Sequence, residues 1–268
     1  MIKQQKHDTA LITGASTGIG ASYALRLAQR GFDLLLVARD QARLDDLAGR
    51  LRADTGVSVE TLRADLTVAA DVARVAQRLS TDPTISMLVN NAGVAVSTPL
   101  LGADPQALEN MISLNVVAVT RLAVAAAGAF AARERGTLIN VASVLALAPE
   151  LFNGAYSGTK AYVLNFTQAL QQELGPRGVR VQAVLPGATR TELWARAGFD
   201  IGNLPSEIVM DVDEMVDAAL AGLDLGETVT IPSLPDVADW DAANSARLAL
   251  APRLSLQHAA SRYARTTS

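Results

Sequence analysis

Three residues in the second half of the chain have types and a spacing suited to proton transfer. Ser143 precedes Tyr156 by thirteen residues, and Lys160 follows Tyr156 by four. If Tyr156 and Lys160 lie on one helix, both side chains occupy the same face. An ammonium ~5 Å from the phenol, at an effective dielectric constant of ~20, favours the phenolate by roughly 3 kcal/mol and lowers its pKa by about two. Such a phenol suits general acid–base catalysis near neutral pH. A Tyr-x-x-x-Lys pair is also common on ordinary helix surfaces, so the remaining motifs decide between the two interpretations.

Short apolar runs alternate with helix-length segments, and this rhythm predicts a parallel sheet with helices on both faces. The predicted strands are Thr9–Thr13, Asp33–Val37, Val57–Leu62, Ile85–Val89, Thr137–Val141, Val179–Leu185 and Thr228–Ile231. The predicted helices are Gly18–Gln29, Gln41–Ala53, Ala69–Leu79, Pro105–Ala132, Gly154–Leu174 and Val212–Leu223. We expect a single domain over residues 1–268, with a substrate loop at about 191–212 and a C-terminal extension at about 232–268.

The first predicted strand leads into a glycine-rich turn that opens a helix. In this position Gly14 permits the tight turn, Gly18 lets the backbone approach a pyrophosphate, and Gly20 lets the helix pack close to the sheet. A glycine turn without a ligand is the alternative interpretation. We expect the turn to bind a dinucleotide through Gly14, Ser16, Thr17, Gly18, Ile19 and Gly20.

The residues after the second predicted strand indicate which dinucleotide binds. Ala38 stands where an acidic residue takes the adenosine 2′-hydroxyl of NAD(H), and Arg39 follows it. Because an arginine accommodates a 2′-phosphate, the sequence favours NADP(H) over NAD(H). Asp40 is interpreted as the N-cap of the next helix. A solvated surface charge is the alternative for Arg39.

Polar turns follow the third and fourth predicted strands. Asp65 is expected either to accept a hydrogen bond from the adenine amino group or to cap its own turn, and Leu66 follows it. The sequence Asn90-Asn91-Ala92-Gly93 lets the backbone turn at the carboxyl end of a strand, where open α/β sheets bind ligands. A plain asparagine-rich turn is the alternative. The cofactor-binding residues expected here are Asp65, Leu66, Asn91, Ala92 and Gly93.

Together these motifs resemble the short-chain dehydrogenase/reductase family over roughly residues 8–192. The glycine turn, the Asn-Asn-Ala-Gly turn, Ser143, Tyr156-x-x-x-Lys160 and Pro186-Gly187 occur in the family's order and approximate spacing. The resemblance implies an α/β, single-domain, doubly wound Rossmann fold of about seven parallel strands in the order 3-2-1-4-5-6-7. It also implies a homodimer or homotetramer formed through the two long predicted helices.

The resemblance also implies roles for further residues. Asn115 would lie beside the catalytic lysine and support a proton path, while Lys160 would hold the nicotinamide ribose as well as act on Tyr156. Thr191 would contact the nicotinamide carboxamide. The other expected cofactor contacts are Tyr156 and, in the same segment as Thr191, Pro186, Gly187 and Thr189.

These residues predict an NADP(H)-dependent oxidoreductase that interconverts a ketone or aldehyde and an alcohol, with Tyr156 as the general acid or base. Apolar residues near the predicted nicotinamide site favour an apolar small molecule over a sugar or a polyanion. A non-catalytic NADP(H)-binding sensor or scaffold is the alternative, and an enzyme acting on nucleotide sugars is a second. The residues expected to contact substrate are Ser143, Leu145, Phe152, Tyr156, Leu193 and Trp194.

Composition restricts the other classes of function. The net charge of -4 and pI of about 5.2 argue against a nucleic-acid partner. The chain has no cysteine and only His7 and His258, so neither a disulfide nor a metal site is expected. The polar start shows no signal peptide, and the longest apolar run, 122–132, is too short to cross a bilayer. We therefore expect a cytoplasmic protein with no membrane partner.

Overall fold

A seven-stranded parallel sheet forms the centre of the protein. The computed structural model describes residues 8–263, and within them the strand order is β3-β2-β1-β4-β5-β6-β7. This order confirms the doubly wound fold that the resemblance implied. Because the winding reverses between β1 and β4, a crevice opens at the carboxyl ends of these two strands. The strands are β1 (Thr9–Thr13), β2 (Asp33–Ala38), β3 (Val59–Arg63), β4 (Ile85–Asn90), β5 (Gly136–Val141), β6 (Val179–Val184) and β7 (Val229–Thr230).

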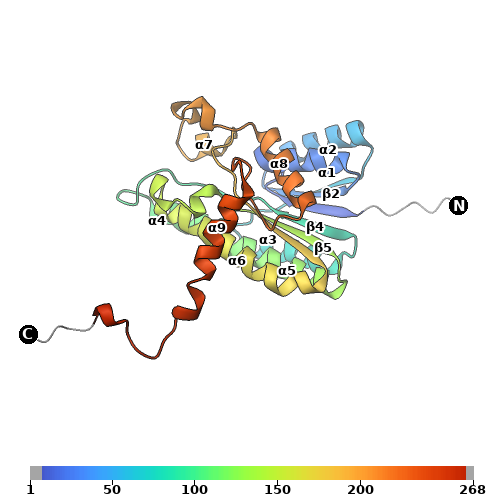
Figure 1. Cartoon of the computed structure of the whole chain (residues 1–268). Helices are drawn as coiled ribbons and strands as arrows, with labels where there is room; N and C mark the ends of the chain where they lie inside the picture. The colour runs from blue at the N-terminus through green and yellow to red at the C-terminus, as the bar shows by residue number, and fades with distance from the viewer. Residues whose placement is uncertain (1–7, 264–268) are drawn as a thin grey trace, which may run out of the picture. The chain divides into compact units, whose positions relative to one another are not determined.

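Helices cover both faces of the sheet (Figure 1). One face carries α1 (Gly18–Gln29), α2 (Gln41–Thr55) and α8 (Val212–Leu225), and the other carries α3 (Ala69–Thr81), α5 (Val119–Ala132) and α6 (Gly154–Leu174). Alternate residues of each strand face opposite sides. Each face of the sheet therefore has its own hydrophobic core, and neighbouring strand residues alternate between the two. Ile12 and Leu36 belong to one core, and Leu11 and Leu35 belong to the other.

The predicted helix over residues 105–132 is continuous but contains a π-helical segment. It runs through α4 (Pro105–Ile112), the π segment Ser113–Ala118 and α5. Its most apolar 18 residues have a mean hydropathy of 1.7, so by length and composition this helix is able to cross a membrane. Burial accounts for part of that composition, since 44% of the window is buried inside the protein. The cytoplasmic location and the homo-oligomer remain predictions.

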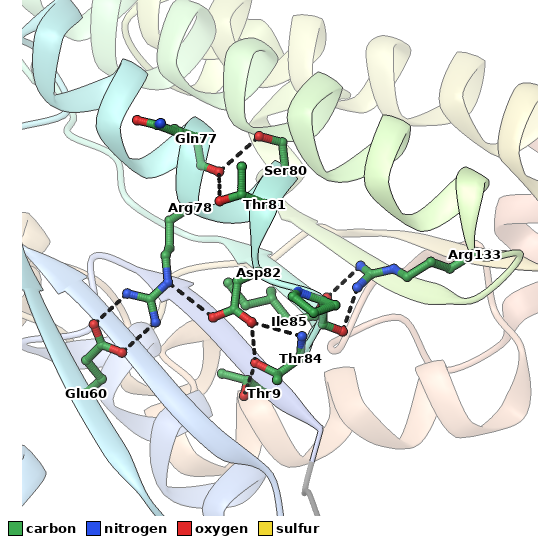
Figure 2. A network of polar contacts seen from close by, with 11 residues as sticks. Thr9, Glu60, Gln77, Arg78, Ser80, Thr81, Asp82, Thr84, Ile85 and Arg133 are labelled. Atoms are coloured by element: carbon green, nitrogen blue, oxygen red, sulfur yellow. Dashed lines mark hydrogen bonds and ion pairs between the residues drawn. The ribbon is translucent and has the colours of Figure 1, made fainter.

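A network of polar contacts lies at the end of the sheet away from the crevice, near the starts of β1 and β4 (Figure 2). Arg78, near the end of α3, binds both Glu60 of β3 and Asp82. Asp82 accepts hydrogen bonds from the backbone and side chain of Thr84, whose hydroxyl is bonded to that of Thr9. These contacts connect α3 to β3 and, through the residues that precede β4, to β1.

Residues after β7 form a separate unit. The chain divides into two compact units between Pro232 and Ser233, near the start of the predicted extension. The second unit contains α9 (Val237–Leu248), which Asp236 caps by accepting a hydrogen bond from the Ala238 amide. None of its described residues, 233–263, is buried. The single domain with a C-terminal extension at about 232–268 stays a prediction.

Candidate active site

Helix α6 places the tyrosine and the lysine beside the serine that follows β5. The Asn153 side chain caps α6 by accepting hydrogen bonds from the amides of Ala155 and Tyr156, which puts Tyr156 in the first turn. One turn later, Lys160 Nζ lies 5.8 Å from the centre of the Tyr156 ring and donates a 3.0 Å hydrogen bond to the Val141 carbonyl. The sequence-predicted triad is thus assembled at one place.

Burial shifts the pKa values of the triad in a direction that the sequence argument missed. Burial raises the pKa of Tyr156 to about 12, and a hydrogen bond with the Ser143 hydroxyl offsets only part of that rise. Burial also lowers the pKa of Lys160 to about 8. The expectation that Lys160 lowers the pKa of Tyr156 is therefore wrong for the cofactor-free protein. The physical reason is that desolvation disfavours both charged forms, the phenolate and the ammonium.

The π-helical segment positions Asn115 next to the lysine. Asn115 Nδ2 donates to the Val94 carbonyl at 2.9 Å and to Thr159 Oγ1 at 3.1 Å, and its Oδ1 accepts from the Val94 amide. A Cβ added at Gly93 would lie 3.2 Å from Asn115 Oδ1 and 3.6 Å from Lys160 Nζ. The two side chains thus converge on Gly93. π-Helical turns inside α-helices often occur at functional sites.

The glycine turn has the close backbone approaches that the sequence predicted. Gly14 has a φ of +64° and Gly18 a φ of +55°, a region that favours glycine. A Cβ at Gly20 would lie 2.3 Å from the Gly14 carbonyl oxygen, so no larger residue fits. Thr17 precedes α1 without a side-chain cap, and the first turn of α1 has no acidic residue. Uncapped amides at a helix N-terminus bind anions, so this turn, which also contains Ser16 and Ile19, fits a dinucleotide pyrophosphate.

Asn91 fixes the glycine turn to the end of β4. Its Nδ2 donates to the carbonyls of Thr13 and Gly14 at 2.9 and 3.3 Å. In return, Thr13 Oγ1 accepts hydrogen bonds from the amides of Asn91 and Ala92, both at 3.0 Å. The Asn91 amide nitrogen is therefore engaged within the protein.

At the expected adenosine end, the structure assigns different roles to Arg39 and Asp65. Arg39 is exposed after β2, and its guanidinium has no hydrogen bond or ion pair within residues 8–263. Asp65 Oδ1 caps its own turn by accepting from the Thr67 amide and hydroxyl at 2.9 and 2.7 Å. Burial raises the pKa of Asp65, but the Thr67 hydrogen bonds and the charges of Arg39 and Arg63 leave it below its usual value. Leu66, next to Asp65, is buried.

The segment after β6 runs from the backbone next to Ser143 back to the glycine turn. The Pro186 carbonyl accepts a 3.0 Å hydrogen bond from the Val144 amide, and Thr189 Oγ1 donates to the Gly187 carbonyl at 3.1 Å. Further along, Thr191 Cγ2 lies 3.2 Å from where a Cβ of Gly18 would stand. The cofactor-binding residues predicted here therefore extend from Ser143 to the glycine turn.

Aromatic side chains continue from Tyr156 into the predicted substrate loop. Ring centres are 5.6 Å apart for Tyr156 and Phe152, 6.2 Å for Phe152 and Trp194, and 5.5 Å for Trp194 and Phe199. A cavity of about 360 Å³ lies in this loop, lined by Thr191, Trp194, Ala195, Gly198, Phe199, Asp200 and Ile201. Leu145 is half-buried two residues beyond Ser143. Leu193, at the start of α7 (Leu193–Arg196), does not line the cavity.

Comparisons with known proteins agree with this geometry. A family model for short chain dehydrogenases matches residues 8–200. The chain is 35% identical over 188 residues to a very-long-chain 3-oxoacyl-CoA reductase of Danio rerio, a match that covers 69% of this chain and 59% of that protein.

Two solved structures are similar over nearly the whole chain. A short-chain dehydrogenase from Sphingobium yanoikuyae, solved with NADPH, is 52% identical with a TM-score of 0.93, over 96% of this chain and 100% of that one. A bulky-bulky ketone specific alcohol dehydrogenase from Comamonas testosteroni is 46% identical with a TM-score of 0.90, over 97% and 100%. The chain therefore belongs to the short-chain dehydrogenase/reductase family and is an oxidoreductase.

Proposed function

We propose that this enzyme interconverts apolar ketones and secondary alcohols with NADP(H). The observation that carries the proposal is the convergence of Ser143, Tyr156 and Lys160 within reach of the glycine turn, through Gly93 and Asn91. A sensor or scaffold without activity is not favoured, because the compared relatives are named as reductases and dehydrogenases.

When bound, the nicotinamide supplies or accepts the hydride; the proton is handled by the chain's own residues. In reduction the Tyr156 hydroxyl donates its proton to the carbonyl oxygen, and in oxidation it accepts one from the alcohol. The Ser143 hydroxyl holds the same oxygen by a hydrogen bond. With a pKa of about 12, Tyr156 stays protonated at neutral pH, which suits the reductive direction.

Lys160 and Asn115 then restore the proton of the phenol. The pKa of Lys160, about 8, lies close enough to neutral for its ammonium to give up a proton and regain it from solvent. Asn115 Oδ1 and Lys160 Nζ both face the position that a Cβ of Gly93 would occupy. Asn115 thereby supports the path by which that proton returns.

NADP(H) is preferred in this proposal because the exposed guanidinium of Arg39, at the end of β2, has no hydrogen bond or ion pair among residues 8–263. The position before it is Ala38, where an acidic residue would take the 2′-hydroxyl of NAD(H) and repel a 2′-phosphate. The Sphingobium yanoikuyae relative was solved with NADPH.

The substrate class follows from the aromatic side chains around the catalytic tyrosine. The Phe152 ring packs edge-on against the Tyr156 ring, and the Trp194 ring packs edge-on against Phe152. Rings in this arrangement suit apolar and aromatic ligands. The Comamonas testosteroni relative is named for ketones that are bulky on both sides. We infer that ketones with two large apolar substituents, aryl ketones among them, are preferred over hydrophilic ones.

The test is a screen of ketones, aldehydes and alcohols with NADPH and NADH side by side, followed by Tyr156→Phe. We expect turnover of apolar ketones, its loss in Tyr156→Phe, and NADPH affinity close to that of the wild type. Tyr162→Phe is the matched control, since Tyr162 lies on the same helix and is 38% exposed. Near-normal kcat in Tyr156→Phe would refute the mechanism, and a higher kcat/KM for hydrophilic substrates would refute the substrate class.

A further inference from the structure

Two consecutive residues of the segment after β6 contact the starts of two different helices. Thr191 packs over Gly18, the first residue of α1. Glu192 accepts two hydrogen bonds from Arg43 Nη1, at 3.1 and 2.9 Å, and Arg43 lies in the first turn of α2. The helix starts are where the pyrophosphate and the 2′-phosphate of the proposed cofactor belong. The segment therefore lies across the mouth of that site.

Other contacts of the segment go to Ser97, Phe152 and Met210 or lie within the segment. Ser97 Oγ donates to the Ala197 carbonyl at 2.5 Å, and Trp194 Nε1 donates to the Thr189 carbonyl at 2.9 Å. Arg196 binds the Glu192 carboxylate at 2.6 Å, but this pair is internal to the segment. Among residues 8–263, the Arg43–Glu192 pair is thus the ion pair that joins the segment to α2.

We propose that the Arg43–Glu192 ion pair ties residues 189–200 across the cofactor site and sets how fast the cofactor leaves. This inference rests on the proposed NADP(H)-dependent function. The side chains of Arg43 and Glu192 are 47% and 51% exposed, so water and salt weaken the pair. A tie of this strength can open often enough for cofactor exchange and still slow it. Both residues act as positioning residues and do not touch the reacting atoms.

A rival role for Arg43 predicts the opposite result. Arg43 lies four residues after Arg39, so its guanidinium could instead bind the 2′-phosphate, with Glu192 as a competitor for it. In that case, removal of the Glu192 charge would free Arg43 and tighten NADPH. In the proposed tie, the same change loosens the segment, and release accelerates for NADPH and NADH alike.

The experiment measures cofactor release from the full-length enzyme by stopped-flow fluorescence. We expect Glu192→Gln and Arg43→Gln each to raise the release rate of both cofactors by roughly three- to fivefold at low salt, with the difference disappearing in 1 M salt. Arg196→Gln is the matched control, because it removes an ion pair to the same carboxylate without cutting the link to α2. The exchanged pair, Arg43→Glu with Glu192→Arg, should restore slow release of NADH. Tighter NADPH binding in Glu192→Gln, or unchanged release in both variants, would overturn the tie.

Hydrogen exchange of the cofactor-free protein separates failure of the tie from failure of the proposed function. Amides of residues 190–200 should exchange faster in Glu192→Gln and Arg43→Gln than in the wild type, and not in Arg196→Gln. This readout requires no cofactor. If the wild type binds no NADPH, the proposed function fails while the exchange result still tests the ion pair. Unchanged exchange in a protein that binds NADPH overturns the tie alone.

Discussion

Lys160 is expected to titrate far below an ordinary lysine, and this prediction tests the electrostatics of the whole site. The side chain is 7% exposed, and burial lowers its pKa from 10.5 to about 8. Between these values the unfolded chain binds a proton that the folded chain has lost, so stability rises with pH. At 1.36 kcal/mol per pKa unit, the rise amounts to about 3 kcal/mol.

Tyr156 gives the opposite sign at higher pH. Its pKa rises from 10.0 in the unfolded chain to about 12 in the folded one, so above pH 10 the folded state holds the extra proton and stability falls. Burial raises the pKa of Tyr23 in the same direction. The free energy of unfolding should therefore increase from pH 8 to about pH 10 and then decrease.

Lys160→Met removes the first of these effects. Below pH 8 the variant no longer buries a charge, which stabilises it by about 3 kcal/mol, and it loses the hydrogen bond to the Val141 carbonyl, which costs about 1 kcal/mol. We expect it to be more stable than the wild type by about 2 kcal/mol at pH 7 and to show no rise from pH 8 to 10, as measured by urea unfolding.

The pKa itself is open to direct measurement. The chain has three lysines, Lys3, Lys6 and Lys160, so lysine-selective isotope labelling gives three signals, and Lys160→Met assigns the one of interest. We expect that signal to titrate near 8. A Lys160 signal that titrates at ~10.4 or above, the ordinary range of lysine, would refute the argument that burial dominates this site.

Two further predictions concern an unpaired hydroxyl and an unpaired cation. Tyr23→Phe should raise the free energy of unfolding by about 1 kcal/mol, because the Tyr23 hydroxyl is buried without a partner among residues 8–263; Tyr162→Phe, which loses a 2.8 Å hydrogen bond to Thr120, should not stabilise the protein. Destabilisation in urea by Tyr23→Phe would contradict this reasoning. Arg39→Gln should weaken NADPH binding roughly tenfold and leave NADH unchanged, with Arg50→Gln on α2 as the control; equal losses for both cofactors would argue against a 2′-phosphate contact.

Features set by neighbouring residues were predictable from the sequence. β1 and α1 have the predicted bounds, because an apolar strand followed by a glycine turn and a helix is a local pattern. Asp40 caps α2 as predicted, with its carboxylate accepting from the Arg43 amide. The turn cap by Asp65 was one of two alternatives, and its partner Thr67 stands only two residues away. An Asp-x-Thr turn of this kind is a signal that could have decided between them.

Features set by burial or by distant residues were not predictable. The pKa values of Tyr156 and Lys160 depend on how much of the fold surrounds them, and the i, i+4 spacing carries no information about that. Arg43 and Glu192 are 149 residues apart, and each alone looks like an ordinary surface charge. The sequence around Asn115 likewise does not indicate a π-helical turn. The Asn115 side chain is held by hydrogen bonds to Val94 and Thr159, which are distant in the sequence.

The turn after β4 joins the proposed cofactor end of the site to the proposed catalytic end. Asn91 holds the glycine turn by its carbonyls, and Gly93, two residues later, lies against Asn115 and Lys160. Asn90, the last residue of β4, donates to Asn140 Oδ1 at 3.0 Å and so fixes the turn to β5. One short turn therefore contacts the glycine turn through Asn91 and lies next to Asn115 and Lys160 at Gly93. The side-chain hydrogen bonds of Asn90 and Asn91 thus attach this turn to β5 and to the glycine turn, and contact of Asn91 with the cofactor stays a prediction.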